Sequence, residues 1–155
     1  MRNTFAKKLV ECASSNKRIT LLSGDIGNRL FDTFKTRFID RFINCGVAEQ
    51  NMTGVAAGLA MQGFLPVTYT IAPFGTTRCL EQIRIDIAYH NLPVTIVSVG
   101  AGLSYASLGP THHSCEDIAF LRSIPNMRIF CPATPFELEA ILSYVFENPS
   151  PTYIR

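Results

Sequence analysis

Short apolar segments bounded by glycine and proline alternate along this chain with segments of helical character, and this alternation limits the fold more than any other feature. The predicted strands cover residues 19–24, 41–45, 66–70, 93–100, 127–133 and 151–155. The predicted helices cover about residues 3–15, 49–62, 78–90, 116–123 and 135–147. Such alternation is typical of a doubly wound α/β fold, and nearly continuous apolar strands suit a mostly parallel sheet with helices on both faces. We therefore expect one domain, 1–155.

Composition excludes several classes of protein. With 155 residues and 47% hydrophobic content, the chain can bury a sizeable core and is not a disordered segment. The net charge of +2 is spread along the sequence, so neither nucleic acid nor an anionic membrane is an expected partner. No apolar run is long enough to span a membrane, and the N-terminus lacks the features of a secretory signal, so a cytoplasmic location is expected.

The cysteines show no pattern of zinc ligands or disulfides. There are five, an odd number, and they are scattered along the chain. We expect free, buried thiols rather than a redox or metal site.

Glu49 is the only charged residue between Cys45 and Gly63, at the start of a predicted helix of small and apolar residues. A carboxylate in such surroundings is costly to desolvate unless a partner binds it. Chemistry is therefore expected at Glu49. The alternative is an acid that only complements the helix dipole.

Two long glycine-rich loops follow predicted strands. One is SGDIGNRLFDTF after the first strand, and the other is GAGLSYASLGPTHHSCED after the fourth. In doubly wound folds the binding crevice lies beyond the carboxyl ends of the strands. Because Glu49 follows the second strand, we expect both loops and Glu49 to meet at one edge of the sheet.

Three segments resemble a known family. GVAEQNMTGVAAGLAMQGFLPV, PFGTTRCLEQIRIDIAYHNLPV and GPTHHSCEDIAFLRSIPNMRIFCPA are similar, in order, to the pyrimidine-binding domain of transketolase-like, thiamine diphosphate-dependent enzymes. These include transketolases and deoxyxylulose-phosphate synthases. The resemblance runs from about residue 19 to the C-terminus and is closest to the N-terminal part of a split transketolase C-terminal subunit.

The resemblance implies roles for residues around the cofactor's aminopyrimidine. Glu49 matches the glutamate that hydrogen-bonds N1′, where an apolar setting lets a carboxyl group share a proton with the ring and so activate the thiazolium C2. Phe74 matches an aromatic residue that stacks on the pyrimidine, with core packing as the alternative. Arg78 is either a cofactor-binding residue or the partner of Glu81 on the same helix.

The resemblance also implies roles for residues of the two glycine-rich loops. His112 matches the family histidine that faces the substrate and assists proton transfer. His113, where the family usually has glutamine, is either a second substrate-binding residue or a polar surface feature. Asp25 and Asn28 resemble the segment near the cofactor's diphosphate, although both are also ordinary turn residues.

Some features typical of the family are missing from this chain, and their absence limits the roles that the resemblance implies. Leu108 stands where sugar-processing members usually have aspartate, and leucine cannot hydrogen-bond a ketose hydroxyl. The G-D-G motif with a downstream asparagine, which holds Mg²⁺ and the diphosphate in a separate domain, is missing, as is the family's third domain. The resemblance therefore implies half an active site on either a natural split subunit or an excised domain, with Mg²⁺ on a partner diphosphate-binding subunit.

Assembly is expected from the same resemblance, as a homodimer or a heterotetramer. The small residues Gly54, Ala57 and Gly58 on the Glu49 helix suit close contact with another helix, or with the chain's own sheet.

Three hypotheses follow for the function. The first is a transferase component that transfers two-carbon ketol units between ketoses or related substrates, inactive as the isolated chain, with a deoxyxylulose-phosphate synthase-like component as a variant. The second is a non-catalytic assembly module of the same fold. The third is an unrelated doubly wound domain, such as a flavodoxin-like protein, in which Glu49 only caps a helix.

Overall fold

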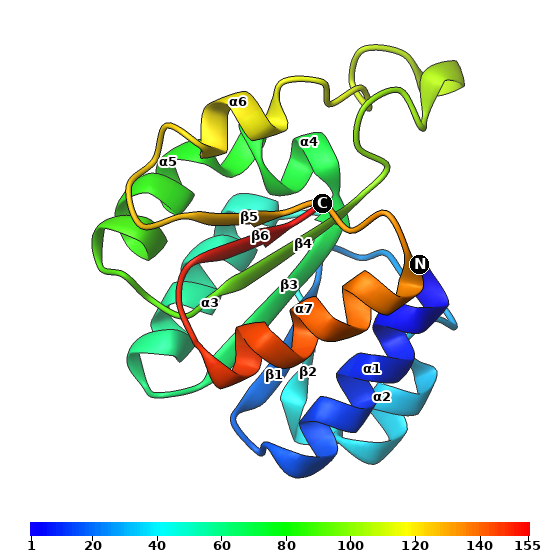
Figure 1. Ribbon diagram of the computed structural model, residues 1–155, viewed down its shortest axis with the longest axis vertical. Coiled ribbons are helices and arrows are strands. Elements are labelled where there is room, and N and C mark those ends of the chain that lie inside the picture. The colour runs from blue at the N-terminus through cyan, green and yellow to red at the C-terminus, as the bar shows by residue number, and fades with distance from the viewer.

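Six parallel strands form one twisted sheet in the computed structural model, which describes residues 1–155 (Figure 1). The strands are β1 (Ile19–Ser23), β2 (Phe42–Asn44), β3 (Leu65–Ile71), β4 (Thr95–Val99), β5 (Arg128–Phe130) and β6 (Thr152–Ile154). Their order across the sheet is β2-β1-β3-β4-β6-β5, and every neighbouring pair is parallel. The predicted doubly wound parallel sheet is confirmed.

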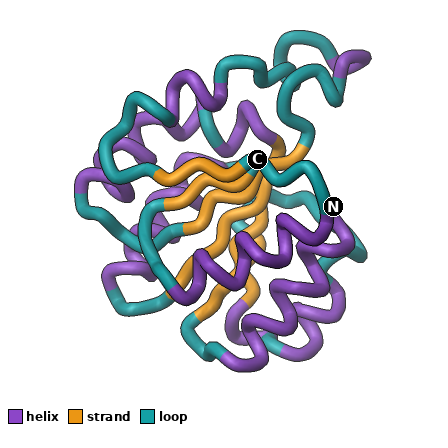
Figure 2. Tube along the Cα trace, in the orientation of Figure 1, coloured by secondary structure: helices purple, strands orange, loops and turns teal.

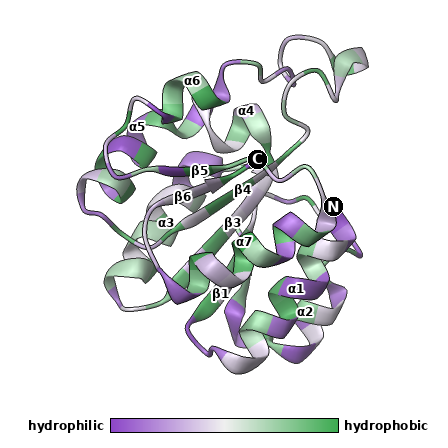
Figure 3. Cartoon of the chain, viewed as in Figure 1, coloured by the Kyte–Doolittle hydropathy of each residue, from purple (hydrophilic) through white to green (hydrophobic).

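Helices cover both faces of the sheet (Figure 2). On one face lie α1 (Arg2–Ser15), α2 (Asp32–Arg37) and α7 (Pro135–Glu147). On the other lie α3 (Glu49–Met61), the π-helix η3 (Ile83–Tyr89) and α6 (Asp117–Leu121). Figure 3 shows apolar residues gathered on the strands and on the helix sides that face them.

Alternating side chains of each strand explain the two cores. In β1, Ile19 and Leu21 point into the core beneath α1 and α7, whereas Leu22 points into the core beneath α3. Since successive side chains of a strand face opposite sides, a strand buried on both sides is mostly apolar, and the polar members of β1 are the small Thr20 and Ser23. All five residues of β1 are buried.

The helix predicted over residues 78–90 is divided in the structure. A 3₁₀ turn, η2 (Thr77–Cys79), and the short α5 (Leu80–Gln82) precede the π-helix η3. Four further short helices, α2, η1 (Ile39–Arg41), α4 (Ala72–Gly75) and η4 (Ala106–Leu108), lie in segments predicted as loops or connections.

The predicted end of one strand is wrong, whereas the predicted start of one helix is right. The strand predicted over residues 127–133 stops at Phe130, close to Pro132, which has no N–H for a strand ladder. The start of α7 is confirmed, because Thr134 Oγ1 accepts a hydrogen bond from the Glu137 amide at 3.2 Å and Pro135 occupies the first turn.

All five cysteines are free, as predicted. The expectation that they are buried is correct only for Cys79, since Cys115 and Cys131 are exposed and the other two are half-buried. Burial raises the pKa of four of the thiols, those of Cys12, Cys45, Cys79 and Cys131. No group of three metal-ligating side chains occurs, and none of the helices has the length and apolar character needed to cross a membrane.

The chain reverses its direction across the sheet next to β1. Strand β2 lies on one side of β1 and β3 lies on the other, so α3 carries the chain from β2 past β1 to β3. In doubly wound folds such a reversal opens a crevice at the carboxyl ends of the strands. Glu49, the first residue of α3, lies at this edge.

Candidate functional site

Glu49 is buried where α3 begins. Its side chain is 3% exposed, and the cap residue before it, Ala48, offers no side-chain cap. Glu49 therefore supplies the negative charge that the positive end of the helix dipole favours. Dipole complementarity does not require burial, so this position alone does not explain why the carboxylate is hidden.

Arg78 is the ionic partner of Glu49. Its Nη1 donates a hydrogen bond to Glu49 Oε2 at 2.7 Å, and its guanidinium carbon lies 4.1 Å from the centre of the Phe74 ring. The expected alternative, pairing of Arg78 with Glu81, is wrong, because Glu81 pairs with Arg84 at 3.0 Å. The structure thus joins Glu49, Phe74 and Arg78 in one cluster at the ends of β2 and β3.

His112 reaches this cluster from the segment between β4 and α6. Its ring lies 5.1 Å from the Phe74 ring in an edge-to-face contact and 6.0 Å from the Tyr105 ring. Its Nδ1 lies 2.9 Å from Thr111 Oγ1. Three segments that are far apart in the sequence therefore meet around Phe74. Glu49 and the loop after β4 meet as expected, but the segment after β3 takes part in place of Asp25 and Asn28 of the loop after β1.

Two glycines allow close packing of the backbone near Glu49. A Cβ atom on Gly24, the residue after β1, would lie 3.0 Å from Thr70 Oγ1 and 3.5 Å from Glu49 Cγ. A Cβ atom on Gly75 would lie 2.8 Å from both Ser98 Oγ and Thr70 Cγ2. Thr70 and Ser98 are buried with their hydroxyl oxygens unpartnered in the protein. Nothing larger than glycine fits at either position without displacing these side chains.

The other predicted site residues lie apart from the Glu49 cluster. Asp25, in a left-handed backbone conformation (φ 57°), accepts a hydrogen bond from Asn44 Nδ2 at 2.8 Å. Asn28 is exposed in a shallow hollow with Arg2 and Arg29. His113 turns back to its own loop, with Nε2 3.3 Å from the Ala106 carbonyl oxygen.

A second buried carboxylate, Asp117, was missed from the sequence. It is 0% exposed, and its Oδ2 accepts hydrogen bonds from Tyr153 Oη at 2.7 Å and Arg155 Nε at 2.9 Å. Burial, together with the bond to Asp117, raises the pKa of Tyr153 far above its usual range. Partial burial lowers the pKa of Arg155, but the bond to Asp117 outweighs it, and the net shift is upward. Like Glu49, Asp117 is an acid at the start of an apolar helix, which is the signal that could have identified it.

The Asp117 group lies at the base of the β4–α6 segment, which projects from the body of the molecule (Figure 1). Gly102 and Ser114 exchange two backbone hydrogen bonds, of 2.7 and 3.0 Å, and close the segment at this base. Arg155 Nη2 lies 3.5 Å from the Ser114 carbonyl oxygen. The base of the segment that contains His112 is therefore joined, through Arg155, to the end of β6.

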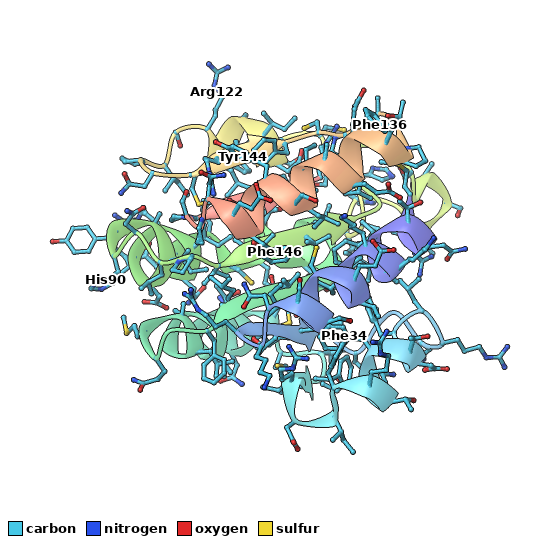
Figure 4. The ribbon with its side chains drawn as sticks, turned by 60° about the horizontal axis from the view of Figure 1, so that its bottom comes forward. Phe34, His90, Arg122, Phe136, Tyr144 and Phe146 are labelled. Atoms are coloured by element: carbon cyan, nitrogen blue, oxygen red, sulfur yellow. The ribbon has the colours of Figure 1, made fainter.

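Two other features lie away from Glu49. A hollow of about 480 Å³ between α1 and α2 is lined by Lys7, Arg29 and Arg37, among others, and by none of the residues of the Glu49 cluster. The third histidine, His90, projects outward (Figure 4) and packs edge-to-face on Tyr89. Neither feature contributes to the cluster around Glu49.

Comparisons with known proteins agree on one family. The family model described as "Transketolase, pyrimidine binding domain" matches residues 1–155. One subunit of the apulose-4-phosphate transketolase of Actinobacillus succinogenes is 42% identical over 122 residues, which are 79% of this chain and 39% of that protein. The 1-deoxy-D-xylulose-5-phosphate synthase of Aquifex aeolicus is 39% identical over 99% of this chain and 24% of its own length.

A solved structure shows the same fold. It is described as a split gene transketolase, inactive beta4 tetramer, and superimposes with a TM-score of 0.88 at 39% identity, covering 99% of this chain and 50% of that one. The chain therefore spans between about a quarter and a half of the length of these relatives.

Proposed function

The chain belongs to the transketolase pyrimidine-binding domain family, and on that premise we propose that it forms the pyrimidine-binding half of a thiamine diphosphate-dependent transferase. Residues 1–155 would make up one such domain. The observation that carries the proposal is the buried Glu49 carboxylate beside the Phe74 ring, at the edge of the sheet where the chain reverses direction.

The residues present fit an aminopyrimidine. Glu49 Oε2 is bonded to Arg78, whereas Oε1 has no hydrogen-bond partner within the chain and is free to face a ring nitrogen. Phe74 is half-buried and offers a flat apolar surface for a heterocycle. Gly24 lets the end of β1 approach Thr70 and Glu49 closely. When bound, thiamine diphosphate would supply a thiazolium C2 that attacks a ketose carbonyl and accepts its electrons.

His112 would act on the substrate side of the same site. Its imidazole packs against Phe74, and its Nδ1 is within hydrogen-bond distance of Thr111, which fixes the ring orientation. An imidazole so placed can donate and accept protons at a sugar hydroxyl. His113, bonded to its own loop, would have at most a supporting role in binding substrate. Asp25 and Asn28, on the β1–α2 loop, would lie near the diphosphate of a cofactor shared with another chain.

Two-carbon ketol transfer is the reaction class that these residues support. Leu108 is 53% exposed on the His112 loop, where no aspartate is available to recognise a sugar hydroxyl. Substrate recognition would therefore differ from that of sugar-phosphate transketolases. The Mg²⁺ and diphosphate contacts would come from a partner subunit, and the chain would be inactive alone, in an assembly that is at least dimeric.

An experiment with the assembled enzyme tests the proposal. The chain is co-expressed with a diphosphate-binding subunit, and exchange of the cofactor's C2 proton is followed by NMR. Glu49→Gln should abolish the exchange with the fold intact, whereas Glu81→Gln, at an exposed carboxylate paired with Arg84, should leave it unchanged. Equal exchange in the Glu49→Gln variant and the unmodified protein would instead support an assembly module without catalysis.

A further inference from the structure

Arg78 holds the buried carboxylate of Glu49 and covers part of Phe74 at the same time. Its Nη1 is 2.7 Å from Glu49 Oε2, and its guanidinium lies 4.1 Å from the Phe74 ring centre. The Glu49 side chain is 3% exposed, and that of Arg78 is 45% exposed. One partner of the pair is thus inside the protein and the other is half in water.

This difference in exposure determines which of the two side chains depends on the other. Removing an ionised carboxylate from water is costly unless a donor replaces the lost hydration, and a hydrogen bond from guanidinium is among the strongest replacements. The half-exposed Arg78 is stable in water without Glu49, whereas buried Glu49 depends on Arg78. The interaction therefore holds the Glu49 side chain in one orientation.

Arg78 itself is held in place by its neighbours. The Gln50 side chain, next to Glu49, donates from Nε2 to the Arg78 carbonyl oxygen at 3.0 Å. Cys79 Sγ donates to the Phe74 carbonyl oxygen at 3.1 Å. The start of α3 and the turn at η2 are thereby joined through both backbone and side chains, and the guanidinium has a flat ring against which to rest.

Only one carboxylate oxygen of Glu49 is used. The terminal torsion of a glutamate rotates over a broad range when nothing restrains it. A bond at Oε2 removes that freedom and leaves Oε1 for a second partner. A carboxylate held in this way presents one oxygen at a fixed place without rearrangement when a ligand arrives.

We propose that Arg78 is a positioning residue that holds Glu49 through Oε2 so that Oε1 meets the ring nitrogen of the aminopyrimidine. The inference rests on the proposed function of Glu49 and gives Arg78 a role that does not require contact with the cofactor. The competing possibility is that Arg78, a planar cationic donor on Phe74, occupies the place of the pyrimidine and must leave when the cofactor binds.

Three substitutions separate these roles. Arg78→Lys keeps the charge but loses the planar group, Arg78→Gln keeps a donor but loses the charge, and Arg78→Met loses both. Arg84→Met is the matched control, since Arg84 is an exposed arginine in the neighbouring helix, paired with the exposed Glu81. Each variant is assembled with the diphosphate-binding subunit, and thiamine diphosphate affinity is measured by calorimetry and C2 proton exchange by NMR.

The expected result is slower exchange with nearly unchanged affinity. A hydrogen bond to a charged group is strong enough to alter a rate by about ten- to one hundredfold, so Arg78→Gln and Arg78→Met should slow exchange by that factor. Arg78→Lys should recover part of the rate. Tighter cofactor binding in Arg78→Met, or exchange equal to that of Arg84→Met, would overturn the inference.

A measurement on the chain itself does not depend on the cofactor. Arg78→Met should lower the thermal midpoint because it leaves buried Glu49 unpaired, and the double variant Glu49→Gln/Arg78→Met should recover most of the loss. Additive losses would show that the two side chains are not coupled, which overturns the inference. If Glu49→Gln leaves C2 exchange intact while this coupling is present, the proposed function fails and the Arg78–Glu49 pairing stands.

Discussion

The hydroxyl of Tyr153 donates a hydrogen bond of 2.7 Å to Oδ2 of the fully buried Asp117, and so joins the last strand, β6, to the first turn of α6. Arg155 Nε reaches the same oxygen at 2.9 Å. The base of the segment that carries His112 depends on this group, since Ser114, which closes the segment, lies three residues before Asp117.

Loss of the Tyr153 hydroxyl should destabilise the protein. Tyr153→Phe deprives a buried carboxylate of a donor, and the free energy of unfolding should fall by about 1–3 kcal/mol in urea denaturation. Hydrogen exchange should also become faster between residues 102 and 114. Tyr144→Phe is the control, because Tyr144 is 47% exposed and its change should stay within about 0.5 kcal/mol. Equal effects of the two substitutions would contradict this role of the bond.

Stability should fall in alkaline solution through Tyr153. Burial, followed by the bond to Asp117, raises the pKa of Tyr153 above its usual value of 10.0. Below that pH the phenol keeps its proton in both states. Above it, the unfolded chain releases a proton that the folded chain retains, so unfolding becomes more favourable as the pH rises.

Urea midpoints measured from about pH 8 to about pH 11 check this expectation, because the range brackets the tyrosine titration. The fall of the urea midpoint with rising pH should be smaller in Tyr153→Phe than in the unmodified protein. Some fall of the midpoint should remain, since burial also raises the pKa of Tyr69 and of four thiols. Identical pH profiles for the variant and the unmodified protein would exclude Tyr153 as the source.

Two glycines should respond in opposite directions to alanine. At Gly75 an added methyl group would lie 2.8 Å from Ser98 Oγ and Thr70 Cγ2, and the overpacking should cost about 1–3 kcal/mol of unfolding free energy. At Gly54, inside α3, nothing lies within 4 Å, so alanine should stabilise the helix by about 0.5–1 kcal/mol. Thermal unfolding of both variants provides the comparison, and a stable Gly75→Ala protein would refute the tight contact.

The same glycine face should matter for assembly. Gly54 and Gly58 have no atoms within 4 Å of an added Cβ, so they do not pack tightly on the chain's own sheet and are free to meet another helix. We expect Gly58→Leu to weaken self-association by about tenfold or more, which corresponds to about 1.4 kcal/mol. Analytical ultracentrifugation measures the effect, with Ala140→Leu on the exposed side of α7 as control. Unchanged association in Gly58→Leu would place the interface elsewhere.

Leu108 should control which ketoses are accepted. Because it is 53% exposed, Leu108→Asp should change the unfolding free energy by no more than about 0.5 kcal/mol. In the assembled enzyme, the added carboxylate should raise kcat/KM for a polyhydroxylated ketose donor, since it supplies a hydrogen-bond acceptor for a hydroxyl. A panel of ketose donors, compared between variant and unmodified protein, tests this; a uniform fall for all donors would argue against a role in selection.

Sequence patterns predicted the strands well because their determinant is local. A strand buried on both faces needs mostly uncharged, apolar residues, and β1 and β3 have them, with only small hydroxyl side chains and one tyrosine between. The π-helix η3 was predicted as part of one α-helix, since its buried residues Ile83, Ile87 and Ala88 have the same apolar spacing that an α-helix would show.

The candidate site was only partly predictable, for a related reason. Glu49 was identified because a single acid on an apolar helix is unusual, and Phe74 and His112 because of the family resemblance. The partner of Arg78 was not determined by spacing along its helix, because Glu81 lies nearby in sequence and Glu49 lies nearby only in space. The position of Asp117 at the start of an apolar helix marks it as a candidate, but its partners, Tyr153 and Arg155, come from a distant segment and follow only from the fold.

The two backbone hydrogen bonds between Gly102 and Ser114 make the His112 segment a closed unit on a fixed base. We expect changes at residues 103–111 to leave the sheet and Glu49 in place, whereas His112, whose ring packs against Phe74, ties the segment to the site. The closed segment thus separates the part of the chain that varies substrate contacts from the buried carboxylate that the sheet holds.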